Sequence, residues 1–501
     1  MRHQQPTNSP KKIIVIGAGM GGLAVAARLS KLGNDVTIFE AADRVGGKCR
    51  TEWINGFGFD TGPSLLTLPA TYRDLFLKTG KRLEHCAPIK PVEPAFSYHF
   101  HDGTKIVIPN LSHPKTVAEF ATKFGEQAGR DWHNLLERAE AMWQASREDF
   151  IESELRIRSF FTRSSFFSDI RTIAPLKSLR SITKEYTRNP YIQKIIERYA
   201  TYTGSDPRKS PAVLLTIAFV EEAFGAWHVE GGLGSLATSL ESRLADLGCR
   251  LHLNTKVRQI LLENGAARGI QLEDGSRHYA DIVISNVDAY LLYQTLLPAM
   301  KETRRARAAL RRATPSLSGF SLQLGLRGKS ELTHHNVFFP ENYDDEFDAI
   351  FKRKVPVPDP AIYICNAPGM TKHPDSESWF VLINAPRHDR NCNWDQPGLK
   401  ESYAESIIDL MEKRGLTVRD RIVEMKIRTP ADLERDVHAP GGAIYGTSSN
   451  GARSAFLRAK NRSPIKNLYC VGGSAHPGGG LPLVAISAEI VANAIVANEA
   501  E

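Results

Sequence analysis

The hydrophobic pattern near the start of the chain alternates between short apolar runs and polar or glycine-rich turns. Residues 13–16 (Ile-Ile-Val-Ile) form a β-branched run that ends at Gly17, which is typical of a buried parallel strand. Helix-forming residues follow at 24–29, a turn at 32–35 and a second apolar run at 36–39. The pattern predicts a strand, a helix and a parallel strand, which together make a βαβ unit.

Similar strand-like runs return far along the chain, at residues 281–285 and 467–473. The second run directly precedes a Gly/Pro-rich loop and a final helical segment. Because distant segments can complete one sheet, we expect a domain that is discontinuous in sequence and follows a loose polar tail at residues 1–10. Its predicted segments are 11–90, 230–300 and 432–501.

The intervening stretches have a different character. Residues 115–225 are aromatic, basic and helix-leaning, whereas residues 315–430 contain strand-like runs. We assign the two intervals 91–229 and 301–431 to a second domain of the α+β class, inserted into the first.

A glycine-rich motif follows the first predicted strand. Gly17, Gly19, Gly21 and Gly22 satisfy G-x-G-x-x-G at the opening of a helix, where backbone N–H groups and the helix dipole can hold a pyrophosphate. Glu40 ends the second strand, where its carboxylate can accept hydrogen bonds from the hydroxyls of an adenosine ribose. The pattern predicts a Rossmann-type nucleotide-binding domain. The alternative is a glycine-rich turn with an unrelated surface glutamate.

The next segment distinguishes between nucleotides. Residues 43–51 resemble the R-x-G-G-[RK]-x-x-[ST] signature of the flavin-containing amine oxidase and phytoene desaturase superfamily. Gly46 and Gly47 allow a tight loop over the diphosphate, and Lys48 or Arg50 offsets its negative charge. A solvated basic turn is the alternative for this segment. The resemblance implies FAD as the cofactor, bound by a GR2-like form of the Rossmann domain.

A C-terminal motif narrows the resemblance. Residues 472–482 are similar to the bacterial-type carotenoid desaturase signature G-[AGS]-x-x-H-P-G-[GA]-G-[IVL]-P of the phytoene desaturase-like family. Glycine N–H groups at the opening of a helix can stabilise a reduced isoalloxazine. His476 is a candidate catalytic base, although a structural role is the favoured alternative. The further cofactor contacts that the resemblance implies are Val257, Gly473, Gly479, Gly480 and Pro482.

The resemblance extends over almost the whole chain and implies a carotenoid substrate. Within the family, residues 198–205, 379–386 and 442–450 look more like the branch that desaturates hydroxylated or cyclic end groups at the 3,4 position than like phytoene desaturase. A branch that oxidises a terminal methyl group of C30 carotenoids to an aldehyde remains an alternative. So do a flavin amine oxidase and a flavin-containing scaffold protein without turnover.

The expected chemistry is removal of a hydride from an allylic CH₂–CH₂ unit to FAD, with loss of a proton from the neighbouring carbon. The adjacent polyene delocalises the developing positive charge. The expected electron acceptor is a quinone or oxygen, and the sequence identifies no proton acceptor.

Charge and cysteine content indicate the compartment. Lys and Arg number 64 against 56 Asp and Glu, which leaves a mild excess of +8, and the six cysteines are scattered. The sequence contains no run of eighteen consecutive apolar residues, so we expect no membrane span. The basic and aromatic residues of 155–184 have an interfacial composition. We expect a cytoplasmic protein that binds a membrane peripherally through this segment. The alternative for the segment is a cationic loop that packs on the protein itself.

Other functional classes lack support in the sequence. The arginines at 304–312 accompany no nucleic-acid-binding motif, so no nucleic-acid partner is expected. No G-x-S-x-G elbow supports a hydrolase. His334 and His335 are adjacent, and neighbours on a strand point to opposite faces, so we expect no metal site.

Overall fold

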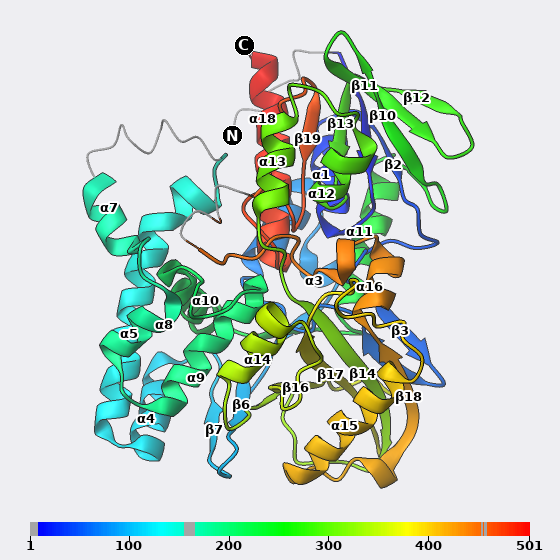
Figure 1. The fold of residues 1–501 in the computed structure, drawn as a ribbon. Coiled ribbons are helices and arrows are strands. Elements are labelled where there is room, and N and C mark those ends of the chain that lie inside the picture. Colours follow the sequence, from blue (N-terminus) through cyan, green and yellow to red (C-terminus); the bar gives the residue numbers. More distant parts are fainter. Residues whose placement is uncertain (1–8, 155–165, 452–453, 455–457, 501) are drawn as a thin grey trace.

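The computed structural model describes residues 9–154, 166–451, 454 and 458–500. Its first sheet has five parallel strands in the order β19-β13-β1-β2-β9 (Figure 1). The strands are β1 (Lys12–Ile16), β2 (Asp35–Phe39), β9 (Arg250–His252), β13 (Ile282–Ser285) and β19 (Leu468–Cys470). Strands from the beginning, middle and end of the chain therefore pair in one sheet, as the apolar runs predicted.

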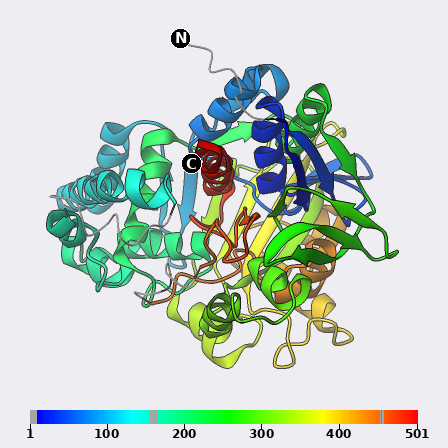
Figure 2. The ribbon, with the colours of Figure 1, turned by 90° about the horizontal axis from the view of Figure 1, so that it is seen from above.

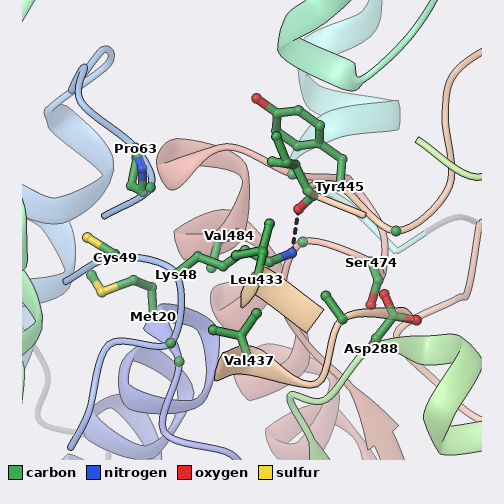
Figure 3. Close-up of a pocket in the computed structure, with 18 of the residues that line it drawn as sticks. Met20, Lys48, Cys49, Pro63, Asp288, Leu433, Val437, Tyr445, Ser474 and Val484 are labelled. Atoms are coloured by element: carbon green, nitrogen blue, oxygen red, sulfur yellow. Dashed lines mark hydrogen bonds between the residues drawn. The ribbon is translucent and has the colours of Figure 1, made fainter. Parts of the chain in front are cut away.

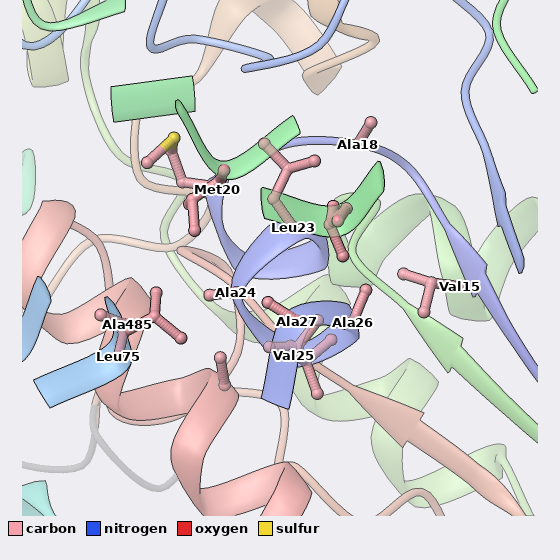
Figure 4. Packing of buried hydrophobic residues seen from close by; sticks show 14 of the residues in the cluster. Val15, Ala18, Met20, Leu23, Ala24, Val25, Ala26, Ala27, Leu75 and Ala485 are labelled. Carbon is pink, nitrogen blue, oxygen red and sulfur yellow. The ribbon is translucent and has the colours of Figure 1, made fainter. Parts of the chain in front are cut away.

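Alternate residues of β1 face two different cores. Ile13 and Val15 pack against the helices on one face of the sheet, whereas Ile14 and Ile16 belong to the core on the other face. Full burial of each such side chain contributes about 1.5–3 kcal/mol. The helices in the first core are α1 (Met20–Lys31), α2 (Ala70–Thr79), α11 (Gly234–Asp246) and α18 (Leu481–Ala500) (Figure 4).

A small antiparallel sheet covers the second face. Its strands, in spatial order, are β10 (Val257–Glu263), β11 (Ala266–Leu272) and β12 (Arg277–Tyr279). The core between the two sheets also contains residues of the short helical segments α12 (Ala289–Leu291) and η4 (Leu292–Leu296) and of α13 (Arg304–Arg312).

The largest sheet has seven strands in the order β18-β14-β17-β16-β15-β6-β7. Among the described strand pairs of this sheet, only β15–β6 is parallel. The bounds are β6 (Phe96–His99), β7 (Lys105–Ile108), β14 (Ser318–Arg327), β15 (His335–Phe338), β16 (Ile362–Asn366), β17 (Ser376–Ala385) and β18 (Ile422–Arg428). Residues of the helix α15 (Leu399–Lys413) share a core with this sheet. The sheet joins strands from both intervals assigned to the second domain, whose limits remain a prediction.

A group of helices lies beside this sheet, on the left in Figure 1. Phe120 stacks on Trp132 with ring centroids 4.4 Å apart, and Asn189 caps a helix by accepting the N–H groups of Tyr191 and Ile192. The helices are α4 (His113–Phe124), α5 (Glu126–Ser146), α7 (Phe166–Ile173), α8 (Leu179–Tyr186), α9 (Pro190–Arg198) and α10 (Thr216–Phe224), with the 3₁₀ segments η2 (Tyr199–Thr203) and η3 (Ala212–Leu215).

Shorter elements connect these parts. They are β3 (Thr51–Ile54), β4 (Phe57–Asp60), α3 (Leu83–Cys86), β5 (Ile89–Pro91), η1 (Arg147–Ile151), β8 (Trp227–Val229), α14 (Asp344–Asp348), η5 (Ala349–Arg353), η6 (Arg419–Arg421), α16 (Pro430–Val437) and η7 (Pro440–Gly442).

The last helix, α18, differs from the expectation that no segment resembles a membrane span. Residues Leu481–Asn498 are long and apolar enough to cross a membrane by length and composition, with a mean hydropathy of 1.7. However, 61% of this window is buried inside the molecule, and the helix packs beside α1 and α2. Seen from above, α18 runs end-on between the helical group and the parallel sheet (Figure 2). Its position in the core accounts for its apolar composition.

Candidate functional site

A cavity of about 1210 Å³ opens where β1 and β2 end and extends to residues of β14 and β17. Small-molecule pockets usually measure about 300–1,000 Å³. The cavity therefore has room for a ligand larger than a typical small molecule.

The glycine-rich turn (residues 17–22) forms one end of the cavity. Gly17 donates its N–H to the carbonyl of Phe39 (2.8 Å) and has a φ of +95°, a left-handed conformation that favours glycine. A Cβ on Gly22 would lie 2.1 Å from the Gly17 oxygen, and one on Gly21 would lie 2.9 Å from the Cα of Gly472. Gly17, Gly19 and Gly21 line the cavity directly, whereas Gly22 supports the turn. Because α1 begins here, its free N–H groups suit an anionic ligand.

Glu40 lines the cavity at the end of β2. Its Oε2 accepts the N–H of Ala18 (2.6 Å) and its Oε1 accepts the N–H of Ala42 (2.8 Å). Each carboxylate oxygen keeps lone pairs for further donors, such as ribose hydroxyls. Beside it, Thr255 donates its N–H to the Glu40 carbonyl (2.7 Å), and Val257 lines the cavity at the start of β10.

The loop sequence suggested that the Lys48 side chain faces a diphosphate, but in the structure it extends to residues 443–444. Its Nζ donates to the carbonyls of Ala443 (3.0 Å) and Ile444 (2.5 Å), so the ammonium contacts the segment before Tyr445 (Figure 3). Burial lowers the pKa of Lys48 to about 8, opposed by the negative charge of Asp288. Lys48 therefore links two parts of the cavity wall that are distant in sequence.

Arg50 also lines the cavity, but its guanidinium binds its own loop. Nε donates to the carbonyl of Val45 (3.1 Å) and Nη2 donates to the carbonyl of Arg44 (3.1 Å). These bonds hold the loop in which Gly46 and Gly47 line the cavity. The expected charge compensation of a diphosphate by Lys48 or Arg50 remains a prediction, and the structure shows that both cations already have backbone partners.

A C-terminal loop (residues 472–480) continues the wall to the start of α18. Gly473, Gly479, Gly480 and Pro482 all line the cavity. A Cβ on Gly479 would lie 2.4 Å from Cδ1 of Tyr445, so only glycine allows this ring to pack so closely. The N-terminal turn of α18, which contains Pro482, therefore borders the cavity.

Arg198 occupies the part of the cavity on the side of the helical group. Its Cζ lies over four rings, which we call the aromatic wall: Phe96 (5.0 Å to the centroid), Tyr98 (5.9 Å), Tyr202 (4.9 Å) and Tyr363 (5.8 Å). The side chain is 7% exposed.

The aromatic wall is held by polar contacts. Glu221 accepts the hydroxyls of Tyr199 (2.7 Å) and Tyr202 (2.9 Å), and burial raises its pKa against the opposing charge of Arg198. Tyr363 accepts the Ser64 hydroxyl (2.8 Å), which fixes the wall beside the N-terminal part of the cavity.

Residues 20–496 match the model of a family described as flavin containing amine oxidoreductase. The chain belongs to this family. Two curated relatives are each 31% identical: a 4,4'-diapolycopene oxygenase from Methylomonas sp. and a 4,4'-diaponeurosporene oxygenase from Staphylococcus aureus. Each match covers 98% of this chain and 99% of the relative. An oxidoreductase from Methanosarcina mazei has the same fold, with a TM-score of 0.67 at 18% identity over 96% of this chain and all of that one.

The protein is thus an FAD-dependent oxidoreductase, and the resemblance stated from the sequence is confirmed. The geometry fits FAD. The cavity has the volume for a dinucleotide, and side chains at Gly21 or Gly22 would disrupt the turn that would face its phosphates. The residues that would hold the cofactor are the glycine-rich turn, Glu40, the Gly46–Gly47 loop, Val257 and the C-terminal loop.

The surroundings of His476 indicate a structural role. His476 is not among the described residues that line the cavity. Its Nε2 contacts the carbonyl oxygen of Ser153 (3.0 Å), and its ring packs edge-on against Phe150. Burial lowers the pKa of His476 to about 4. The geometry favours the structural alternative over the catalytic base.

His334 and His335 are closer to a third ligand than the sequence suggested. His334 precedes β15, and Cys365 lies opposite His335 in the sheet. Their ligand atoms lie within 4.8 Å of one another. His335 uses Nδ1 for the hydroxyl of Tyr363 (2.8 Å). Because His334 lies outside β15, the rule that neighbours on a strand point to opposite faces does not apply to this pair.

The basic and aromatic segment lies partly outside the described residues, which exclude 155–165. In the described part, Leu176 is 92% exposed, whereas Arg180 pairs with Glu197 (2.6 Å) and Asp344. One cation thus packs on the protein itself, and an apolar side chain nearby faces outward.

Several cavity residues were not singled out from the sequence. Residues 198–205 and 442–450 were noted only as family-like segments, although they supply Arg198, Tyr202 and Tyr445. Asp288 carries no local motif, and it caps the N-terminal turn of α12 by accepting the N–H of Tyr290 (2.8 Å). An arginine followed by tyrosines in an apolar context was the available signal for the aromatic wall.

Proposed function

We propose that the protein oxidises the end of a carotenoid, converting a terminal methyl group into an aldehyde. The names of the two relatives support an oxygenase of 4,4'-diapocarotenoids, which the sequence left as an alternative. Bound FAD supplies a hydride acceptor. The overall change, R–CH₃ + O₂ → R–CHO + H₂O, takes oxygen as the oxidant.

The observation that carries the proposal is the continuity of the cavity. It extends from the residues placed to hold FAD, past Lys48 and Tyr445, to a region with many apolar side chains. A long polyene offers almost no polar groups, so its binding depends on apolar burial and the exclusion of water. The apolar residues of this region include Ile217, Val220, Val337, Phe380 and Leu382.

End-group desaturation is the second candidate. It is favoured by the C-terminal loop, whose sequence resembles the carotenoid desaturase signature. In that reaction the substrate loses two hydrogens and gains no oxygen. An amine oxidase activity shares the family and requires an amine in place of the polyene.

The test is expression in cells that make a panel of C30 and C40 carotenoids, followed by absorption spectra and product masses. A product that gains oxygen at its end supports terminal oxidation. Loss of hydrogens alone supports desaturation instead. If no carotenoid changes while purified protein releases peroxide from an amine, the carotenoid proposal is wrong.

We also propose that the protein binds the membrane peripherally on the cytoplasmic side, since a carotenoid substrate dissolves in lipid. Leu176 and Ile170, which are 92% and 38% exposed, support this proposal. The neighbouring cation Lys177 pairs with Glu185 (2.7 Å).

A further inference from the structure

The guanidinium of Arg198, in the cavity wall, has a hydrogen-bond donor that no protein group accepts among the described residues. Its Nη1 is buried and has no hydrogen-bond partner among the described residues. Tyr343 also lines the cavity. Its hydroxyl is likewise buried and has no hydrogen-bond partner among the residues that the structure describes. Buried charged donors are rarely left unpaired, because the loss of water is then uncompensated. Two unpaired donors in one wall indicate a place for an acceptor that the chain itself does not supply.

The aromatic wall fixes the position of this cation. Rings of Phe96 and Tyr202 lie about equally close to Cζ, at 5.0 Å and 4.9 Å. Stacking on ring faces leaves the edge of the planar guanidinium free to donate hydrogen bonds. The arginine is therefore held in place by contacts that leave its Nη1 without a partner.

The charge balance selects the kind of acceptor. Glu221 lies near enough to affect Arg198 electrostatically, and its two oxygens already accept the hydroxyls of Tyr199 and Tyr202. A ligand carboxylate would meet the negative charge of Glu221, whereas a neutral carbonyl oxygen would not. The surrounding rings favour an apolar chain attached to that oxygen.

The location relates the donor to the reacting end of a substrate. Tyr363 of the aromatic wall accepts a hydrogen bond from Ser64. Gly204 directly follows η2 and packs closely on Tyr445, since a Cβ added to it would lie 3.0 Å from Cδ2 of that ring. Both Ser64 and Tyr445 line the cavity beside the residues placed to hold FAD. The free donors are thus on the flavin side of the apolar region.

We propose that Arg198 binds the carbonyl oxygen of an oxygenated polyene end, and so makes the cavity selective for a polyene aldehyde over the corresponding hydrocarbon. This inference rests on the proposed function and assigns it a specificity-determining residue. The site would hold the aldehyde end of a product, or the already oxidised end of a substrate that carries two reactive ends.

The test measures binding to the FAD-loaded enzyme of two probes with the same chain length, a C30 polyene aldehyde and the C30 polyene hydrocarbon. A hydrogen bond from a cation to the carbonyl favours the excited state of a conjugated aldehyde, so its absorption maximum should shift to the red on binding. The hydrocarbon should show no comparable shift. Arg198→Met should weaken aldehyde binding by about tenfold to a hundredfold and leave hydrocarbon binding unchanged.

Two further variants serve as controls. Arg198→Lys keeps the charge and should retain part of the aldehyde preference. Lys194→Met removes a cation from the same helix, where its Nζ donates to Pro340 and Glu341 carbonyls (2.9 Å each), and should change neither affinity.

The outcomes separate this inference from the proposed function. Equal weakening of both probes by Arg198→Met, or a bound aldehyde without a red shift in the wild type, overturns the role of Arg198 alone. The wild-type spectrum decides this even if the Arg198→Met chain does not fold. If the wild-type enzyme binds neither polyene, the carotenoid function and this inference both fail.

Discussion

Lys48 and Asp288 lie in the same cavity wall, and each favours the charged form of the other. The charge of Asp288 raises the pKa of Lys48, and the charge of Lys48 lowers the pKa of Asp288. Burial acts in the opposite direction on both. It lowers the pKa of Lys48 to about 8 and raises the pKa of Asp288. A cation beside the cofactor site is thus close to its neutral form at mildly alkaline pH.

The shift predicts a pH dependence of stability. The pKa of a lysine in the unfolded chain is near the ordinary value of 10.5, whereas the pKa of Lys48 in the folded protein is about 8. Between these values the unfolded state binds more protons, so the free energy of unfolding rises with pH. The rise from this group amounts to at most about 3 kcal/mol. Buried thiols such as Cys49 and Cys365, whose pKa values burial raises, contribute with the opposite sign in the same window. Chemical denaturation across this window should therefore show the free energy of unfolding of the wild type rising relative to that of Lys48→Met.

A lysine on the surface provides the comparison. Lys301 has a side chain that is 92% exposed, so Lys301→Met should leave the pH dependence as it is in the wild type. Identical curves for the wild type and Lys48→Met would show that Lys48 is not desolvated.

The contact between Gly21 and Gly472 predicts loss of cofactor from Gly21→Ala. The added methyl group would lie 2.9 Å from the Cα of Gly472 and 2.6 Å from Oδ1 of Asn286, so the turn has to open. We expect the purified variant to contain much less FAD per protein, measured by flavin absorbance after denaturation. Gly33→Ala is the control: its backbone has a φ of +89°, but no atom lies within 4 Å of the new Cβ. It should lose about 1 kcal/mol of stability and keep its FAD. Full FAD content in Gly21→Ala would contradict the placement of the phosphates.

The parts of the site that the sequence predicted are those whose signals are local. The strand at 13–16, the glycines after it and Glu40 lie close together in sequence, and the spacing of such residues reflects backbone geometry directly. The same holds for the C-terminal loop and the start of α18.

The remaining features depend on contacts between distant residues. Lys48 reaches the carbonyl of Ala443, 395 residues away, and no local pattern indicates that direction. The aromatic wall combines Phe96 and Tyr98 of β6 with Tyr202 of η2 and Tyr363 of β16. The aromatic wall exists only once the strands and helices have packed, so no local sequence pattern assigns a role to Arg198.

The carboxylate of Glu40 is expected to bind the adenosine ribose. Glu40→Ala removes a charged acceptor and should weaken FAD binding by about tenfold or more. FMN has no adenosine, so its affinity should stay the same in the variant. Equilibrium titration of the apoprotein with each flavin measures both effects. Asp43→Ala, whose side chain is 74% exposed in the next loop, is the matched control and should bind FAD normally. Equal losses for FAD and FMN would instead point to collapse of the turn, because Glu40 also accepts the N–H of Ala18.

The exposed position of Leu176 provides a test of membrane binding. Burying a leucine side chain in the acyl region contributes about 1.5–3 kcal/mol, and each nearby cation adds about 1 kcal/mol at an anionic surface. Leu176→Ser should therefore lower binding to anionic phospholipid vesicles by about tenfold, measured by co-flotation at low salt. Leu77→Ser removes a leucine that is 65% exposed on α2, outside the basic segment, and should have no effect. Equal flotation of the wild type and Leu176→Ser, or flotation that is independent of anionic lipid, would show that this surface does not bind the membrane as proposed.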